Sequence, residues 1–225
     1  MQKFIASHSN VLHSYYRQLQ LFFKRLIPVY TAYLFSRLLF YALNRHMFQG
    51  VGFSSLVWDC FAGLRFDSFS IVVSNALFIL LSTLPVKWFW NARYQSLLRY
   101  LYLIPNSIFL AFNFIDCAYY SFIKKRSTAE LFDQLGGQSD MSKLLPQFMR
   151  DYWYLLLLWF LFIFLLAFWY KQITIRPAKD SAKNRPLLNY LLFLVIVALS
   201  TIGARGGLQR VPIDVVNAGG MVHIE

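Results

Sequence analysis

The chain has 225 residues, of which 58% are apolar, 19% are aromatic and only 14% are charged, and its formal net charge is +12. This composition excludes an ordinary soluble domain, in which about a quarter of the residues are charged. The apolar residues also occur in long runs, and a helix needs roughly 20 apolar residues to cross about 30 Å of hydrocarbon. The sequence therefore predicts an all-α membrane protein.

Five apolar runs predict a five-helix transmembrane bundle over residues 26–204, with spans at about 26–43, 66–86, 97–122, 152–170 and 187–204. The fourth run, YWYLLLLWFLFIFLLAFWY, carries Tyr and Trp at both ends, where aromatic rings prefer the water interfaces. The first run contains Pro28 and Arg37, and the third contains Pro105 and Asn106. Each of these two spans is therefore expected either to be kinked or to line the inside of the bundle.

Residues 1–25 are predicted to form a retained cytoplasmic segment, because no apolar core long enough for a cleaved signal peptide precedes the first charges. The stretch YYRQLQLFFKRL is consistent with an interfacial helix whose Arg17, Lys24 and Arg25 face anionic head groups. A plain solvated leader fits the same residues equally well.

Basic residues predict the orientation. Twelve of the 22 lysines and arginines fall in the N-terminal segment and the short loops on its side of the membrane; nine fall on the other side, five of them in one long loop. Short loops are where the positive-inside rule has force. Of the ten acidic residues, all but Asp180 lie on or beside the second side. The N-terminus is therefore expected inside and the C-terminus outside.

The long loop between the third and fourth spans contains the stretch RSTAELFDQL. It begins with Ser and Thr followed by an acidic residue, and its apolar residues are spaced three or four positions apart. This pattern predicts a short interfacial helix on the outer surface.

Polar residues gather near the predicted outer ends of the spans. GLRFDSFS places Arg65 and Asp67 at the start of the second span, and NFIDCAYYSFIKKRST places Asp116 on one helical face with two tyrosines. Guanidinium groups at this depth would hold a lipid phosphate, and carboxylates would orient them. The same residue types are also typical interfacial anchors and ion pairs between helices. For Arg37, inside the first span, an internal salt bridge or a cap on kinked backbone is favoured over a transport role.

The sequence shows no catalytic centre of its own. Its four histidines are scattered over different segments, so no metal-ligand spacing appears, and neither a hydrolase elbow nor a phosphate-binding glycine loop is visible. Cys60 and Cys117 both fall toward the outer side; they could pair in an oxidising envelope or remain free thiols.

Three segments carry a family resemblance: GLRFD before the second span, NFIDCAYYSFIKKRST closing the third, and GARGGLQRVPIDVVNAG after the fifth. In this order they resemble the N-terminal membrane domain of the lipoteichoic acid synthase and phosphoglycerol transferase family, in the sulfatase and alkaline-phosphatase-like superfamily. The resemblance covers residues 20–220. It implies a bacterial cytoplasmic (inner) membrane protein whose five helices anchor an extracytoplasmic α/β domain.

In that family, by the same resemblance, the α/β domain uses a threonine nucleophile and a divalent cation, commonly manganese, to move phosphoglycerol from a phospholipid to an envelope acceptor. This chain does not contain that domain, so no cofactor is expected in the chain itself, and residues 205–225 would be the tether to it. Substrate-side or domain-docking contacts are implied at eight positions: Arg65, Asp67, Asp116, Lys124, Arg126, Thr128, Arg205 and Gln209.

The expected partners are membrane lipids, anionic phospholipid above all, and the catalytic domain; nucleic acid is not expected. The alternative function is a stand-alone, non-catalytic membrane protein, such as a lipid-binding or scaffolding subunit. A transporter component fits less well, because its polar residues would be expected near the bilayer midplane rather than at the rim.

Overall fold

The computed structural model describes residues 2–48, 52–123, 150–173 and 186–205. Four helices in these ranges are long and apolar enough to cross a membrane, and a bent pair makes up to five. The described residues contain no strand, which confirms the all-α prediction and is consistent with a multi-pass membrane protein. The interfacial helix predicted between the third and fourth spans lies outside the described residues, as does the tether beyond Arg205.

The elements in chain order are α1 (Gln2–Leu43), η1 (Arg45–Met47), α2 (Phe53–Ser74), α3 (Ala76–Thr83), η2 (Lys87–Trp90), α4 (Ala92–Ile123), α7 (Trp153–Gln172) and α8 (Pro186–Ala204).

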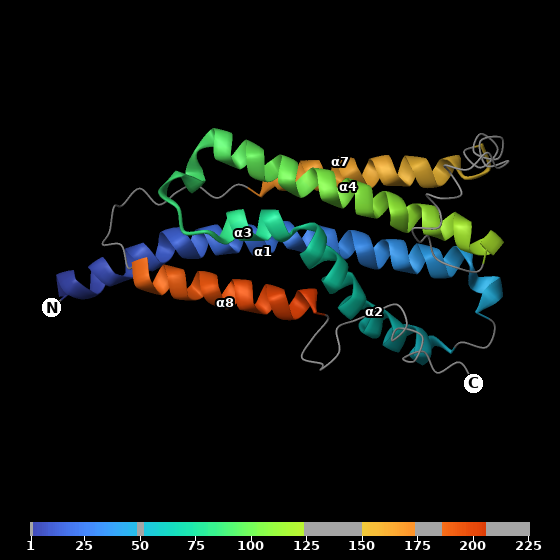
Figure 1. Ribbon diagram of the computed structural model, residues 1–225, viewed down its shortest axis with the longest axis horizontal. Coiled ribbons are helices and arrows are strands. Elements are labelled where there is room, and N and C mark those ends of the chain that lie inside the picture. Colours follow the sequence, from blue (N-terminus) through green and yellow to red (C-terminus); the bar gives the residue numbers. More distant parts are fainter. Residues whose placement is uncertain (1, 49–51, 124–149, 174–185, 206–225) are drawn as a thin grey trace.

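Helix α1 runs through the middle of the bundle (Figure 1). Its 42 residues would measure roughly 60 Å at about 1.5 Å per residue, about twice the thickness of a hydrocarbon core. Its Tyr15–Leu43 part is long and apolar enough to contain a membrane span. Helices α2, α3, α4 and α7 all pack against α1.

The residues just before Leu26 pack against other helices on one face of α1. Tyr15, Gln18 and Arg25 are buried, and the side chains of Tyr15 and Gln18 donate hydrogen bonds to backbone carbonyls at the end of α3, at 2.7 to 2.9 Å. Together with the buried Leu21 and Phe22, these positions recur every three or four residues, so they continue the buried face of α1. One face of Tyr15–Arg25 is thus packed inside the bundle, while Lys24 is exposed.

Helices α2 and α3 form one element that bends by 71° at Asn75. The side chains of Asn75 and Asn106 of α4 donate to each other, at 3.0 and 2.8 Å, and both residues are fully buried. Asn75 also donates to the Ile71 carbonyl oxygen, and Asn106 to that of Tyr102. The polar groups at the break are therefore satisfied inside the bundle.

Cross-helix contacts define two ends of the bundle. At the end that we call the Arg25 end, the Tyr102 hydroxyl of α4 donates to the Arg25 carbonyl oxygen of α1. At the opposite end, which we call the Asp67 end, Arg37 of α1 binds Asp67 of α2. The bent pair contacts α1 at both ends, because α3 finishes at the Arg25 end and Asp67 of α2 binds Arg37 at the other. Figure 1 shows α3 beside α1 and α2 sloping away from it.

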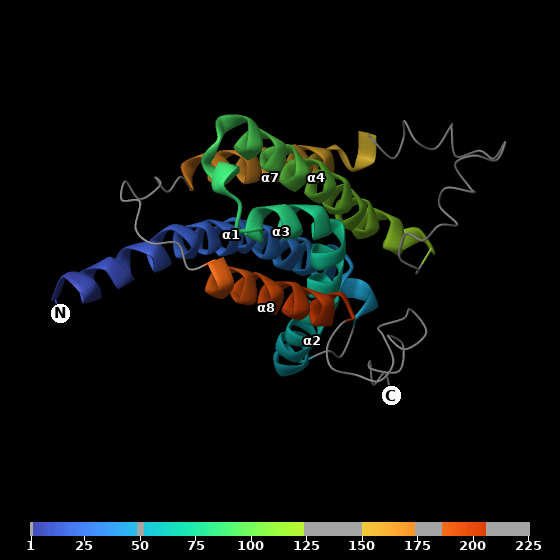
Figure 2. The ribbon, with the colours of Figure 1, turned by 60° about the vertical axis from the view of Figure 1, so that its left-hand side comes forward.

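Helices α7 and α8 lie on different sides of α1 (Figures 1 and 2). Helix α7 packs on α4 and α1, and the Trp159 indole donates to the Ser107 carbonyl oxygen of α4. Helix α8 packs on α2. Both helices leave many large apolar side chains exposed, for example Phe164 and Leu199. Such surfaces are expected where a helix faces lipid tails instead of water.

Candidate functional site

Two of the predicted site residues, Asp67 and Asp116, line the same small cavity at the Asp67 end. The cavity lies among α1, α2 and α4, and its volume of about 20 Å³ is close to that of one water molecule. The remaining lining residues are Tyr33, Ser36, Arg37, Phe40 and Asn113. Two sequence segments separated by about 50 residues thus meet against the first span.

Asp67 is bound by Arg37, which lies on α1. Nη2 of Arg37 lies 2.6 Å from Oδ1 of Asp67, and Nε lies 3.3 Å from Oδ2. Nη2 also donates to the Gly63 carbonyl oxygen at 2.9 Å. This arrangement confirms the internal salt bridge predicted for Arg37. A carboxylate and a guanidinium that bind each other in this way reduce the cost of holding either charge away from water.

The guanidinium group of Arg37 leaves no room for a side chain at position 63. A Cβ atom built at this position would overlap the guanidinium group of Arg37. Gly63 therefore provides both the carbonyl acceptor and the room for the side chain that uses it. In the GLRFD segment the residues that meet Arg37 are Gly63 and Asp67, which are one helical turn apart.

Arg65 is half-buried on α2. Positions i and i+2 of a helix do not share a face, so Arg65 and Asp67 point in different directions. Arg205, which follows α8, is exposed. Helix α8 approaches α2 at Gly203, where a Cβ atom would lie 3.3 Å from Val72. Arg205 lies two residues beyond Gly203, and Arg65 lies seven residues before Val72 on α2.

The other four predicted contacts, Lys124, Arg126, Thr128 and Gln209, lie outside the described residues. The 20 Å³ cavity is far below the several hundred Å³ of a typical ligand pocket, so a phospholipid head group does not fit inside it. A head group at this end would have to lie above the cavity. Asp67 contributes to helix packing through its salt bridge with Arg37.

Tyr33 is a residue of this cluster that the sequence analysis did not single out. Its side chain is buried, and its hydroxyl makes no hydrogen bond in the described part of the chain. Tyr33, Ser36, Arg37 and Phe40 are spaced at i, i+3, i+4 and i+7, so they form one face of α1. This spacing is visible in the sequence, where it marks a partly polar stripe on the first span.

Neither Cys60 nor Cys117 forms a disulfide in the described part of the chain. Cys117 is buried, and its Sγ donates to the Asn113 carbonyl oxygen of the preceding turn at 3.2 Å. Within the described ranges, no three His, Cys, Asp or Glu side chains are grouped closely enough to hold a metal ion. No step of a metal-dependent reaction is therefore assigned to these residues.

Comparison with known protein families, curated proteins and solved structures found no match to this chain. The family resemblance therefore depends on the three segments quoted above and on the arrangement of the helices that carry them.

Proposed function

We propose that this chain is the membrane module of a phosphoglycerol transferase-like enzyme of the bacterial cytoplasmic membrane. It crosses the membrane five times, with the α2–α3 pair as the second crossing, and its N-terminus is inside. The Asp67 end then faces outward, where the module anchors a catalytic domain and holds an anionic phospholipid head group beneath it. The threonine nucleophile and the divalent cation of the family would belong to that domain.

The observation that carries this proposal is the meeting of the GLRFD and NFIDCAYY segments. Gly63 and Asp67 from the first and Asp116 from the second surround Arg37 or line the cavity beside it. Because these residues pack against one another, there is a physical reason for the two segments to occur together in one chain. Arg65 lies between Gly63 and Asp67 on α2, and α8, which Arg205 follows, packs on α2, so these two guanidinium groups are the candidates to bind a phosphate.

The lipid part of the proposal is tested by charge reversal at Arg65 and at Arg205. Purified protein in nanodiscs of phosphatidylcholine with a minor fraction of phosphatidylglycerol would be analysed for bound lipid by native mass spectrometry. Each basic residue near a head group contributes about 1 kcal/mol, so Arg65→Glu and Arg205→Glu should each lower phosphatidylglycerol retention about fivefold or more.

Arg45→Glu is the matched control, because Arg45 is an exposed arginine at the same end and lies outside the three segments. It should retain phosphatidylglycerol like the unmodified protein. Equal retention in all three variants, with unchanged thermal unfolding, would leave only an anchoring role for Arg65 and Arg205.

The family part of the proposal is tested separately by the coding sequence beyond codon 225. We expect it to continue, in frame or after a frameshift, into an α/β domain with a threonine nucleophile and metal ligands. A stop codon with no such domain downstream would contradict the transferase proposal. It would favour a stand-alone lipid-binding subunit if the lipid test succeeds.

A further inference from the structure

Charges are separated between the two ends of the bundle. Two described acidic residues, Asp67 and Asp116, line the cavity at the Asp67 end. At the Arg25 end, Lys24 and Arg25 are adjacent on α1, and Arg25 contacts Gln95 near the start of α4 and Tyr170 near the end of α7. In the described part of the chain, neither Lys24 nor Arg25 forms a salt bridge. An anionic counterpart from outside the protein would be attracted there.

Arg25 carries a positive charge inside the protein, without a salt bridge in the described part of the chain. The residue is only 6% exposed, and its guanidinium group lies 3.8 Å above the ring centroid of Tyr170. Nη2 donates to Oε1 of Gln95 at 3.1 Å, while Nε makes no hydrogen bond in the described part of the chain. The buried cation is thus surrounded by neutral groups. Its positive charge reaches the neighbouring surface of α1 with little compensation.

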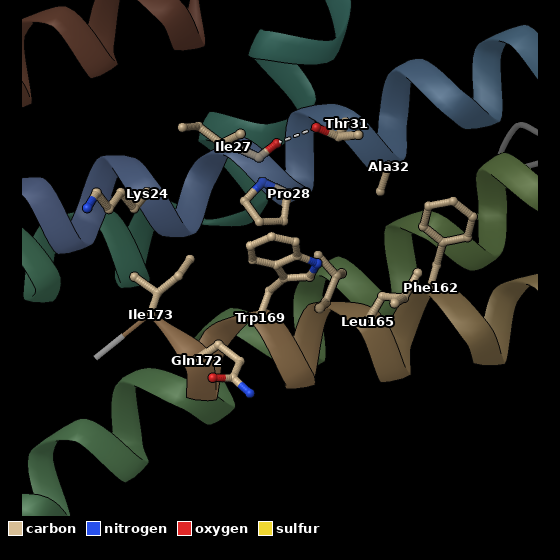
Figure 3. A pocket seen from close by; sticks show the side chains of 11 residues that line it. Lys24, Ile27, Pro28, Thr31, Ala32, Phe162, Leu165, Trp169, Gln172 and Ile173 are labelled. Carbon is tan, nitrogen blue, oxygen red and sulfur yellow. Dashed lines mark hydrogen bonds between the residues drawn. The ribbon is translucent and has the colours of Figure 1, made fainter. Parts of the chain in front are cut away.

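The surface next to Arg25 is an open groove of about 520 Å³ between α1 and α7. Its lining is mainly apolar, and the hydroxyl of Thr31 donates back to the Ile27 carbonyl oxygen, so it adds no free polar group. Figure 3 shows the Trp169 ring in the middle of the groove below Pro28, with Lys24 toward one end and Phe162 toward the other. The groove is therefore apolar along its length and cationic at one end.

The length of the groove matches one leaflet. From Phe162 to Ile173 the lining follows three turns of α7, roughly 16 Å at about 1.5 Å per residue. This length is about half of the 30 Å hydrocarbon core of a bilayer. Lys24 lies at the end where the head groups of that leaflet are expected.

We propose that the groove between α1 and α7 binds an acyl chain of an anionic phospholipid from the leaflet at the Arg25 end, with the lipid phosphate paired to Lys24. The apolar lining alone would not select this lipid, because bilayer tails are as apolar as the groove. Selection comes from the exposed ammonium group of Lys24 and from the buried positive charge of Arg25 beside it. This site is separate from the head-group contacts proposed at the opposite end of the bundle.

Trp169 provides a local probe, because it lines the groove and its side chain is about half exposed. The full chain would be placed in phosphatidylcholine bilayers containing a minor fraction of brominated phosphatidylglycerol or, in parallel, brominated phosphatidylcholine. Bromine on an acyl chain quenches nearby indoles. Subtracting the signal of Trp169→Phe isolates the quenching of Trp169 from that of the other five tryptophans.

At equal fractions in the bilayer, quenching of Trp169 should show that brominated phosphatidylglycerol is about fivefold more concentrated next to this residue than brominated phosphatidylcholine. Lys24→Gln should remove this preference. Lys87→Gln is the control, because Lys87 is an exposed lysine at the same end that does not line the groove. Thr31→Trp, which fills the groove, should reduce retention of phosphatidylglycerol in native mass spectrometry.

Equal quenching by the two lipids in the unmodified chain would overturn the proposal. It would also be overturned if Lys24→Gln and Lys87→Gln reduced the preference for phosphatidylglycerol to the same extent. Arg65→Glu and Arg205→Glu should leave the preference at Trp169 unchanged. The outcome is therefore independent of the lipid test at the Asp67 end.

Discussion

At the scale of single residues, the contact of Arg37 with Gly63 and Asp67 shows how an arginine is accommodated inside a predicted membrane span. The salt bridge leaves the side chains of Arg37 and Asp67 only 21% and 14% exposed. The guanidinium also uses a backbone carbonyl that no side chain on Gly63 obstructs. An uncompensated charge at this depth would be costly, so the three residues are expected to depend on one another.

Gly63→Ala tests this dependence. The added Cβ atom would displace the guanidinium of Arg37 and leave the Asp67 carboxylate without its partner. We expect a loss of about 1–3 kcal/mol in the free energy of unfolding. The loss should appear as a lower midpoint in thermal unfolding of detergent-purified protein, followed by tryptophan fluorescence.

Gly203→Ala is the matched control, because its Cβ atom would meet only a methyl group of Val72, at 3.3 Å. We expect a change of less than about 1 kcal/mol for this variant. If Gly63→Ala unfolds at the same midpoint as Gly203→Ala, the guanidinium of Arg37 can leave Asp67 without cost and the salt bridge does not stabilise the bundle.

At the scale of the helices, the break between α2 and α3 depends on Asn75 and Asn106. Asn106→Leu would remove both hydrogen bonds between the two amides and leave the Asn75 amide buried without them. Hydrogen bonds between helices in membranes contribute about 0.6 kcal/mol on average and up to about 1.7 kcal/mol. We expect a loss near the upper value, measured by equilibrium unfolding in mixed detergent.

Ser107→Ala provides the control for this prediction. The Ser107 hydroxyl donates only to the Leu103 carbonyl oxygen of its own helix, and the Trp159 indole uses the backbone oxygen of Ser107, which alanine keeps. Its stability should stay close to that of the unmodified chain. An Asn106→Leu variant as stable as Ser107→Ala would show that the break does not need the amide pair.

The helices also show how far the sequence alone could predict this fold. Apolar length located α7 and α8 almost to the residue, because no contact with other segments is needed to recognise a mainly apolar run of 18 or 19 residues. The burial of Arg25 did not follow from the sequence, because an arginine before an apolar run is typical of the membrane interface, and its contacts with Tyr170 and Gln95 come from distant segments.

The site was predictable to a smaller extent, for the same reason. The grouping of Asp67 with Asp116 followed from their shared depth, and the structure places both at one cavity. The partner of Asp67 did not follow, because Arg65 is two positions away whereas Arg37 is 30 positions away on another helix. The bend at Asn75 was hidden as well, since an asparagine within an apolar run has no fixed backbone preference.

At the scale of the whole molecule, the separation of charge predicts the orientation, and the bent pair determines the number of crossings. If α2 and α3 form one broken span, Arg45 and Lys87 lie on opposite sides of the membrane. If the pair is a re-entrant loop, both residues lie on the same side. The contacts of α3 with the start of α1 and of α2 with its later turns favour a crossing.

Single cysteines at positions 45, 87 and 205 would decide between these topologies in a Cys60→Ser background, where the buried Cys117 is protected from a membrane-impermeant maleimide. Because the Arg25 end carries the excess of lysine and arginine, it should be cytoplasmic. We expect Arg45→Cys and Arg205→Cys to be labelled in spheroplasts, and Lys87→Cys only after permeabilisation. Labelling of positions 45 and 87 under the same condition would show that α2 and α3 enter and leave on one side. Labelling of position 87 alone in spheroplasts would reverse the orientation, and the head-group contacts proposed for Arg65 and Arg205 would then face the cytoplasm.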